Sequence, residues 1–231
     1  MRRPPRVNRR AALAQEVEFW HNWLATGGLQ WPEDYRFRTD PEAEVDDPAL
    51  RDILEAIPQS KVSVLDVGAG PITGIGFRYP GKELALTAVD PLAREYDRIL
   101  SEHGLEPPIR TEALRGEDLL SRFQPGSFDV AFARNALDHA VDPLPIIENM
   151  IAVVRPGGYV LLRHAVNEAV TEGYGQLHQW NFDERDGRCL VWRRPGRHRD
   201  IAVELGDGAE VRCTRDQFIG YEWVCCVIRK R

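Results

Sequence analysis

The sequence predicts an α/β fold built on a doubly wound, mostly parallel sheet. Short apolar runs rich in β-branched residues alternate with longer amphipathic segments, which is typical of strands and helices in turn. The first apolar run, Val62–Val67, stops in Gly68 and Gly70, and the next run ends in Asp90, twenty residues after Gly70. A strand that leads into a glycine turn is the usual cradle for a nucleotide-like ligand in such sheets.

The composition allows a globular domain and argues against two classes of partner. The 231 residues are 43% hydrophobic, enough to fill one α/β core with appendages. A formal net charge of −6 gives no general attraction to nucleic acid, and no apolar run approaches the length of a membrane span. The four cysteines form no C-x-x-C pair, so we expect reduced core thiols and a cytoplasmic protein.

The N-terminal part is expected to be an extension of the main domain. Residues 1–8 are rich in Arg and Pro and are expected to be disordered. From Arg9 to Ala25 apolar residues recur every three or four positions, which predicts an amphipathic helix that ends at Thr26-Gly27-Gly28. The aromatic residues of this helix indicate either simple core packing or a lid over a ligand. We interpret residues 31–47 as a long polar connector.

The central part supplies the elements of the sheet in order. Asp47 and Pro48 begin a helix that continues to about Ile57, with Asp47 as its cap. Strands are predicted at 62–67, 84–89, 109–114, 128–133 and 158–163, and further helices at 91–103 and 143–154. Residues 71–78 are expected to pass over the ligand site into a short helix.

Beyond Arg163 the alternation weakens. A polar, aromatic stretch covers residues 164–188, and three β-like runs follow at 189–193, 201–205 and 221–229. The last run, Tyr221 to Arg229, is predicted to be the final strand.

The glycine turn departs from a dinucleotide site. Thr73 stands where the third Gly of G-x-G-x-x-G belongs, and Gly74 comes one position later. Asp66 precedes the turn, where its charge would face the pyrophosphate of a dinucleotide. A carboxylate there suits a cationic ligand better, such as the sulfonium and amino groups of S-adenosylmethionine. A nicotinamide-dependent dehydrogenase is therefore disfavoured.

At this point the chain resembles the class I S-adenosylmethionine-dependent methyltransferases. Residues 64–70 match the first motif of that family and residues 88–90 the second. Three further matches follow in the expected order: the adenine-binding turn at 116–119, the fourth strand at 127–132 and the turn into strand five at 155–162. The resemblance covers roughly residues 50–165 and implies a Rossmann-like, seven-stranded, mostly parallel sheet with an antiparallel last strand. It also implies S-adenosyl-L-methionine as the cofactor.

The resemblance carries over to individual cofactor-binding residues. Gly68 and Gly70 would approach the methionine part, with Asp66 near its ammonium group, and Asp90 would hold the ribose hydroxyls. Glu117 or Asp118 would meet the adenine amino group, and we favour Glu117. Asn135, at the carboxyl end of the fourth strand, lies where ligands bind in open sheets. The predicted cofactor-binding residues are Asp66, Gly68, Ala69, Gly70, Asp90, Pro91, Glu117, Asp118 and Asn135.

The acceptor side is less sharply defined. The sulfonium already activates the methyl group, so the protein mainly holds donor and acceptor in line and excludes water. His139 and His178 are the candidate general bases, in a pocket between the first helix and the stretch from Tyr174 to Phe182. His139 is either structural or near the acceptor, and the stretch is either a binding loop or a plug for the sheet edge. His164 is more typical of a core histidine. No run of metal ligands occurs, and no metal is expected.

The sequence therefore predicts methyl transfer to an oxygen or nitrogen of a small polar metabolite. The position after the fourth strand reads Arg134-Asn135-Ala136-Leu137, not the tetrapeptide of amino-directed nucleic-acid methylation. The alternative is a non-catalytic S-adenosylmethionine-binding protein of the same fold. We expect residues 1–47 to form an N-terminal extension with a lid helix. Residues 48–231 would form the methyltransferase domain, with an acceptor-side insertion at about 164–188. We expect no nucleic-acid or membrane partner and leave a homodimer open.

Overall fold

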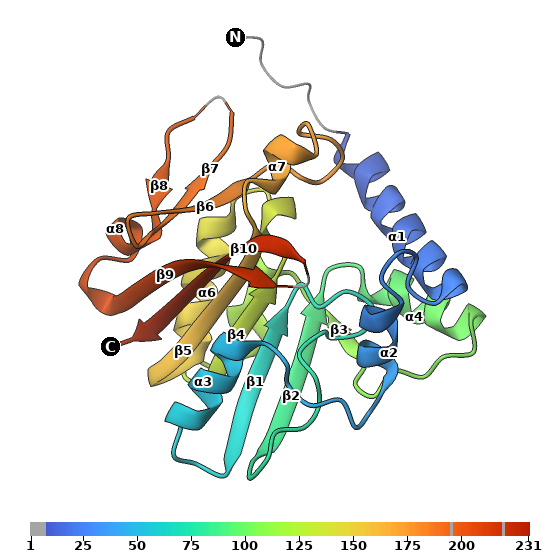
Figure 1. Ribbon diagram of the computed structural model, residues 1–231, viewed down its shortest axis with the longest axis horizontal. Coiled ribbons are helices and arrows are strands. Elements are labelled where there is room, and N and C mark those ends of the chain that lie inside the picture. Colours follow the sequence, from blue (N-terminus) through green and yellow to red (C-terminus); the bar gives the residue numbers. More distant parts are fainter. Residues whose placement is uncertain (1–7, 195, 219) are drawn as a thin grey trace.

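A seven-stranded sheet organises the molecule, as Figure 1 shows. The computed structural model describes residues 8–194, 196–218 and 220–231; the predicted disorder of residues 1–8 falls almost wholly outside them. The strand order is β3-β2-β1-β4-β5-β10-β9. The strands are β1 (Lys61–Val67), β2 (Glu83–Asp90), β3 (Thr111–Ala113), β4 (Phe128–Arg134), β5 (Val154–Ala165), β9 (Ala209–Phe218) and β10 (Tyr221–Lys230). The first five run parallel, and β10 is antiparallel to both β5 and β9. The predicted fold class is confirmed.

Helices cover both faces of this sheet because its central strands are apolar on both sides. Val62 and Val64 of β1 pack with α3 (Pro48–Ala56) on one face. Leu65 and Val67 belong to the core on the other face, with α6 (Pro143–Val153). α4 (Ala93–Glu102) follows β2 and packs with α1 (Arg9–Thr26) around buried Trp23. The start of α3 is as predicted: Asp47 accepts a hydrogen bond from the Leu50 N–H at 3.0 Å.

Two expectations about the first third of the chain are wrong. The connector 31–47 contains a helix, α2 (Pro32–Thr39), which Pro32 opens in the first helical turn. Residues 71–78 form turns and a bridge, not a short helix. This segment is tied to the connector, because Phe77 N–H donates to Ala43 O at 2.7 Å and Gly76 leaves no room for a Cβ beside Glu44.

The last third adds a second, three-stranded sheet in the order β6-β7-β8, on the β9 side of the molecule and away from α1 (Figure 1). Its strands are β6 (Asn181–Arg185), β7 (Arg188–Trp192) and β8 (Arg199–Asp200). The predicted strand at 201–205 is wrong: Ile201–Leu205 is the helix α8. Asp200 caps α8 by accepting from the Ala202 N–H at 3.0 Å, and this favours the helical start.

The short elements complete the chain. They are η1 (Gly116–Asp118), α5 (Leu119–Arg122), η2 (Leu137–His139), α7 (Glu168–Thr171) and η3 (Gly206–Gly208). η2 follows β4 and α7 follows β5, so both lie at the carboxyl edge of the parallel strands. No helix in the described part of the chain is long and apolar enough to cross a membrane.

Candidate active site

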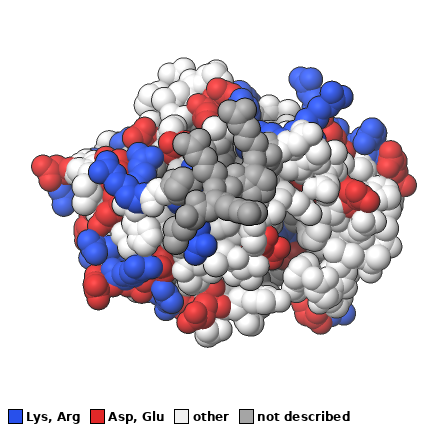
Figure 2. Space-filling view, turned by 90° about the horizontal axis from the view of Figure 1, so that it is seen from above, with Lys and Arg blue, Asp and Glu red and all other residues white. Residues whose placement is uncertain are grey.

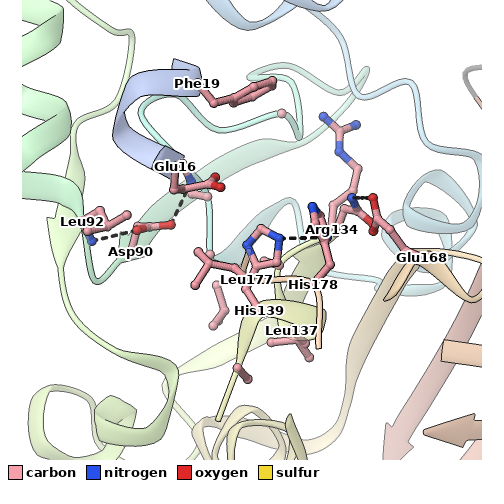
Figure 3. Close-up of a pocket in the computed structure, with 18 of the residues that line it drawn as sticks. Glu16, Phe19, Asp90, Leu92, Arg134, Leu137, His139, Glu168, Leu177 and His178 are labelled. Atoms are coloured by element: carbon pink, nitrogen blue, oxygen red, sulfur yellow. Dashed lines mark hydrogen bonds between the residues drawn. The ribbon is translucent and has the colours of Figure 1, made fainter. Parts of the chain in front are cut away.

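A large cavity lies at the carboxyl ends of β1, β2, β4 and β5. Its volume is about 1240 Å³. Figure 3 shows Asp90 and Leu92 on one side of it, His139, His178 and Glu168 on the other, and side chains of α1 above. The glycine turn after β1 lines the cavity between these two groups of side chains. One space therefore joins the predicted cofactor residues to the predicted acceptor residues.

The turn after β1 requires its glycines. Gly68 has φ +78°, and a Cβ there would lie 2.4 Å from the Cβ of Ala136. Gly70 has φ +68°, and a Cβ there would lie 3.0 Å from the Trp20 ring of α1. Side chains at these positions would be strained and would also collide with β4's exit or with α1. Backbone can therefore approach a ligand closely at this turn.

Asp90 is buried and fixed by the same turn. Its carboxylate accepts N–H groups from Gly70 at 3.2 Å and from Leu92 at 2.8 Å. Burial raises the pKa of Asp90 to about 6, although these two hydrogen bonds oppose the rise. Each oxygen accepts one protein N–H and keeps a lone pair for a ligand donor. Asp90 can thus order the chain that follows β2 and still hold a pair of hydroxyl groups.

Asp66 lies at the floor of the cavity. Thr73 Oγ1 donates to its Oδ2 at 2.6 Å. Burial raises the pKa of Asp66, while the Thr73 hydrogen bond and the nearby Arg134 and Arg38 lower it in part. The structure thus gives Thr73, which breaks the glycine pattern of a dinucleotide site, a contact of its own.

The remaining predicted cofactor residues divide into those that line the cavity and one that does not. Ala69, Pro91, Glu117 and Asn135 line it. Glu117 is held by Arg115 at 3.2 Å. Asp118 does not line the cavity, and its side chain is 55% exposed. Of the two alternatives at the adenine turn, the geometry favours Glu117.

Asn135 is already engaged by protein groups. Its φ is +48°, and its side-chain Oδ1 accepts from the Ala165 N–H at 3.2 Å. Its Nδ2 donates to Glu168 Oε1 at 2.9 Å. The amide therefore ties the end of β4 to β5 and α7, and it positions Glu168 at the cavity wall.

On the acceptor side, two histidines share one buried carboxylate. His178 Nδ1 lies 2.7 Å from Asp138 Oδ2 and 3.2 Å from His139 Nε2, and His139 Nε2 lies 3.5 Å from Asp138 Oδ2. Burial alone would lower the pKa of His178, but the hydrogen bond and charge of Asp138 outweigh it and raise the pKa to about 9. Burial likewise opposes ionisation of Asp138, but the two histidines lower its pKa. Both histidines line the cavity.

Glu168 lies beside this group. Burial and the charge of Asp138 raise the pKa of Glu168 to about 7. Its Oε2 is buried and has no hydrogen-bond partner among the described residues. Sequence reasoning missed Glu168, because it lies in a polar stretch without a motif. It also assigned no role to Asp138, although that residue stands next to His139.

The stretch from Tyr174 to Phe182 lies partly in the cavity wall and partly in the core. Gln176, Leu177 and His178 line the cavity. Trp180 and Phe182 pack into the core, and Asn181 is fully buried. His164 is also buried away from the cavity, stacked on Phe182 at 3.8 Å, and burial lowers its pKa to about 4. The second part of the stretch thus covers the core, while the role of Gln176, Leu177 and His178 at the cavity stays a prediction.

α1 both lines the cavity and packs in the core. Arg9, Glu16, Phe19 and Trp20 line the cavity from above, while Leu24 packs in the core with α4. Trp20 Nε1 donates to Glu16 at 2.9 Å, and Arg9 donates to the backbone oxygen of His139 at 3.1 Å. The helix is thus tied to the acceptor side as well as to the glycine turn.

Comparison with known proteins identifies the central part of the chain. Residues 65–162 match the family described as "Methyltransferase domain". These residues form a class I S-adenosylmethionine-dependent methyltransferase domain. The match runs from within β1 to within β5 and includes the glycine turn, Asp90, Glu117 and His139.

Relatives and solved structures agree with the methyltransferase domain. Two similar proteins are the ubiquinone biosynthesis O-methyltransferases of Albidiferax ferrireducens and Ralstonia nicotianae. The first is 29% identical over 159 residues, 65% of this chain and 56% of that protein. The second is 30% identical over 150 residues, 64% of this chain and 58% of that protein. The chain thus matches little more than half the length of these relatives.

Among solved structures, the 1,6-didemethyltoxoflavin-N1-methyltransferase of Burkholderia thailandensis superimposes with a TM-score of 0.54. The match covers 98% of this chain and 92% of that one at 16% identity. The likeness shows that the methyltransferase fold continues through the elements that follow β5.

Proposed function

We propose that this chain transfers the methyl group of S-adenosyl-L-methionine to a small polar acceptor, at an oxygen or nitrogen atom. The observation that carries the proposal is the single cavity of about 1240 Å³ that contains both sets of residues. Typical small-molecule pockets measure about 300–1,000 Å³, so there is room for a cofactor and an acceptor side by side. The methyltransferase domain supplies one wall, and the region after β5 supplies the other.

The cofactor would be held by the residues of the first three strand ends. Gly68 and Gly70 admit the methionine part beside Asp66, Asp90 accepts the ribose hydroxyls, and Glu117 lies at the adenine end. The cofactor supplies an activated methyl group. The task of the chain is then to hold the acceptor in line with that methyl group and to exclude water.

Oxygen is the favoured acceptor atom. An amine can arrive unprotonated, but a hydroxyl group keeps its proton at neutral pH and needs a group that takes it. Two such groups lie at the cavity wall: the candidate base His139, and Glu168, whose pKa is raised to about 7. The pKa of His178, raised to about 9, keeps that imidazole protonated at neutral pH, so His178 takes a proton only at higher pH. The two relatives named above are O-methyltransferases, which supports the same choice.

The flanking parts of the chain have roles in this proposal. We propose that α1 is a lid, because it lines the cavity from above and contacts the glycine turn through Trp20. The region around 164–188 would select the acceptor, because α7 and the loop before β6 contribute Glu168, Gln176 and His178 to the cavity.

Nucleic acid is not the proposed acceptor. The net charge of the chain is −6. Among the described residues on the face shown in Figure 2, acidic and basic side chains are interspersed and do not gather into one basic patch. Binding to nucleic acid depends mainly on such basic patches. We also propose a cytoplasmic location, since all four cysteines are free thiols. Sedimentation would decide whether the chain forms a homodimer.

The test pairs binding with turnover. Calorimetry should show that S-adenosylhomocysteine binds the purified chain, and radiolabelled S-adenosylmethionine should then label members of a panel of phenols and alcohols. A matched panel of anilines and amines with the same carbon skeletons distinguishes oxygen from nitrogen. Cofactor binding without turnover of either panel would instead support the non-catalytic alternative.

A further inference from the structure

We propose that Asp138, His139 and His178 bind a divalent first-row transition cation, and that this cation binds the acceptor oxygen. The site lies in the wall of the cavity where the acceptor enters, so its role in the reaction rests on the proposed function. Its existence as a metal site does not.

The distances between the three ligand atoms fit one ion. They are 2.7 Å, 3.2 Å and 3.5 Å between Asp138 Oδ2, His178 Nδ1 and His139 Nε2. Transition ions bind nitrogen and oxygen at about 2.0–2.2 Å, so neighbouring ligands in octahedral or tetrahedral sites lie roughly 2.8–3.6 Å apart. The 3.2 and 3.5 Å separations fall in this range, and the 2.7 Å separation lies just below it. An ion at that radius would lie about 1 Å out of the plane of the three atoms.

The hydrogen bonds of the group without an ion are incomplete. When the proton of His178 Nδ1 makes the 2.7 Å contact, that nitrogen has no lone pair left to accept a hydrogen bond from His139 Nε2 at 3.2 Å. The remaining contact, 3.5 Å from His139 to the carboxylate, is too long for a good hydrogen bond. Of the three contacts among Asp138, His139 and His178, only one is therefore a good hydrogen bond. A cation, in contrast, accepts a lone pair from each of the three ligand atoms.

The surrounding charge also favours a cation. Asp138 Oδ1 and Glu168 Oε2 are both buried and have no hydrogen-bond partner among the described residues. Figure 3 shows Glu168 on the same side of the cavity as His178. Two carboxylates without full compensation are costly in a buried site, and a divalent ion beside them removes that cost.

The donor set selects the class of ion. Two imidazole nitrogens and one carboxylate suit iron, cobalt, zinc or manganese, whereas magnesium and calcium prefer oxygen ligands alone. Three protein ligands leave positions open, as in catalytic metal sites. His139 and His178 line the cavity, so those positions face the space where the acceptor would lie.

The proposed step is a balanced methyl transfer. The acceptor hydroxyl binds the ion, its pKa falls, and its proton leaves to solvent or to Glu168. The oxygen then attacks the methyl carbon as the sulfur–carbon bond breaks. The electron pair of that bond stays on sulfur, and S-adenosylhomocysteine leaves with the methylated acceptor. No oxidant or reductant is needed.

A second cluster of ligands provides the competing site. The sulfur atoms of Cys189, Cys213 and Cys226 lie within 4.8 Å of one another. All three residues are buried in the apolar core and do not line the cavity. Packing explains them, but their thiols could capture a test metal, and the experiment must exclude this.

The test is a titration of the untagged, metal-free protein with Co²⁺, without cofactor or acceptor. Calorimetry should show one equivalent bound, with visible absorption of Co²⁺ and without an ultraviolet sulfur-to-cobalt band. His178→Ala and His139→Ala should each weaken binding roughly 100-fold or more. Circular dichroism would establish that each variant is folded, and either folded variant suffices.

Two control variants sharpen the result. His103→Ala removes an exposed histidine outside the cavity, and Cys213→Ser breaks the sulfur cluster. Both should leave Co²⁺ affinity within about twofold of the wild type, a difference below about 0.4 kcal/mol. No binding, a sulfur-to-cobalt band, or unchanged affinity in folded His178→Ala protein would each overturn the metal site.

Two outcomes distinguish a chain without the metal site from a chain without methyl-transfer activity. Cobalt bound at the histidines with no turnover of any acceptor would keep the metal site and reject the function. Turnover by protein that binds no Co²⁺, and that chelators leave unchanged, would keep the function and reject the metal. His139 or Glu168 would then be the metal-free base.

Discussion

The buried carboxylate of Asp90 is expected to lower the free energy of unfolding when it is ionised. Its side chain is 7% exposed, and burial raises its pKa from 3.8 to about 6. A raised pKa means that the folded state prefers the protonated carboxyl. The stabilisation that it contributes is fully present below about pH 3.8 and is lost as the pH rises through 6. At pH 8 the ionised carboxylate therefore destabilises the folded protein relative to a neutral group.

The size of this effect follows from the change in pKa. The rise from 3.8 to about 6 corresponds to about 3 kcal/mol. Asp90→Asn removes the charge and keeps one acceptor for the Gly70 or Leu92 N–H, so the gain should be about 1–3 kcal/mol at pH 8. At pH 4 the folded wild type is already protonated, and the two proteins should have nearly equal free energies of unfolding.

The same substitution should damage cofactor binding. Ionised Asp90 would accept charge-assisted hydrogen bonds from the ribose hydroxyls. An amide in its place would reduce the binding free energy of the cofactor by roughly 1.5–3 kcal/mol. Affinity for S-adenosylhomocysteine should fall about ten- to a hundredfold at pH 8.

Urea unfolding at pH 8 and pH 4 measures the stability, and calorimetry at pH 8 measures the affinity. The control is Asp97→Asn, a half-exposed carboxylate on α4 that pairs with Arg110 at 3.1 Å and lies outside the cavity. A less stable Asp90→Asn protein at pH 8 would refute the electrostatic reasoning. Undiminished affinity in a folded variant would move the ribose contact elsewhere.

Three further substitutions test the glycine turn, a buried ion pair and the first helix. Gly68→Ala should lower the free energy of unfolding in urea by about 1–3 kcal/mol more than Gly81→Ala does. Both glycines have positive φ, but only Gly68 lacks room for a Cβ, so equal losses would contradict the predicted clash. Arg163→Met leaves buried Asp47 without its 2.8 Å ion pair and should cost about 3–5 kcal/mol by the same assay, and a loss below about 1 kcal/mol would argue against that role. Trp20→Ala should speed release of S-adenosylhomocysteine roughly tenfold in stopped-flow measurements, and an unchanged rate would remove the lid role of α1.

The parallel strands could be predicted because their signal is local. Each is a short apolar run, and the run at 62–67 differs from β1 by one residue. β9 has no such signal. It is the last strand on its side of the sheet, and its sequence, Ala209–Phe218, reads as largely charged and polar. Strands of this kind bury few side chains, and among the β9 residues whose burial is described these are Ala209 and Cys213, so the pattern resembles a loop. The sequence pattern therefore predicts a strand at 201–205, where the structure has α8, and misses β9 a few residues later.

Local sequence signals also explain why the glycine turn and Asp90 could be predicted more sharply than the group around Asp138. The glycine turn and Asp90 belong to consecutive strand ends, so short motifs contain them. His139 and His178 were each identified as candidates. Their meeting at Asp138 depends on a loop that returns about 40 residues later, as the separation of Asp138 and His178 shows. Hydrophobic periodicity carries no information about such a return.

If the proposed function is right, the attachment of this loop separates the choice of acceptor from the binding of the cofactor. The backbone oxygen of Asp138 accepts the N–H groups of Gln179 and Trp180, at 3.0 and 3.1 Å, and Trp180 Nε1 donates to Val141 O at 3.3 Å. These contacts involve backbone atoms and a core side chain, so they do not depend on what Gln176 or Leu177 presents to the cavity. Asp66, Gly70 and Asp90 lie at the ends of β1 and β2, and within the described part of the chain they share no hydrogen bond with residues 176–180. Substitutions at the cavity-facing positions of the loop can therefore change which acceptor fits while the cofactor half and the Asp138–His178 contact stay in place.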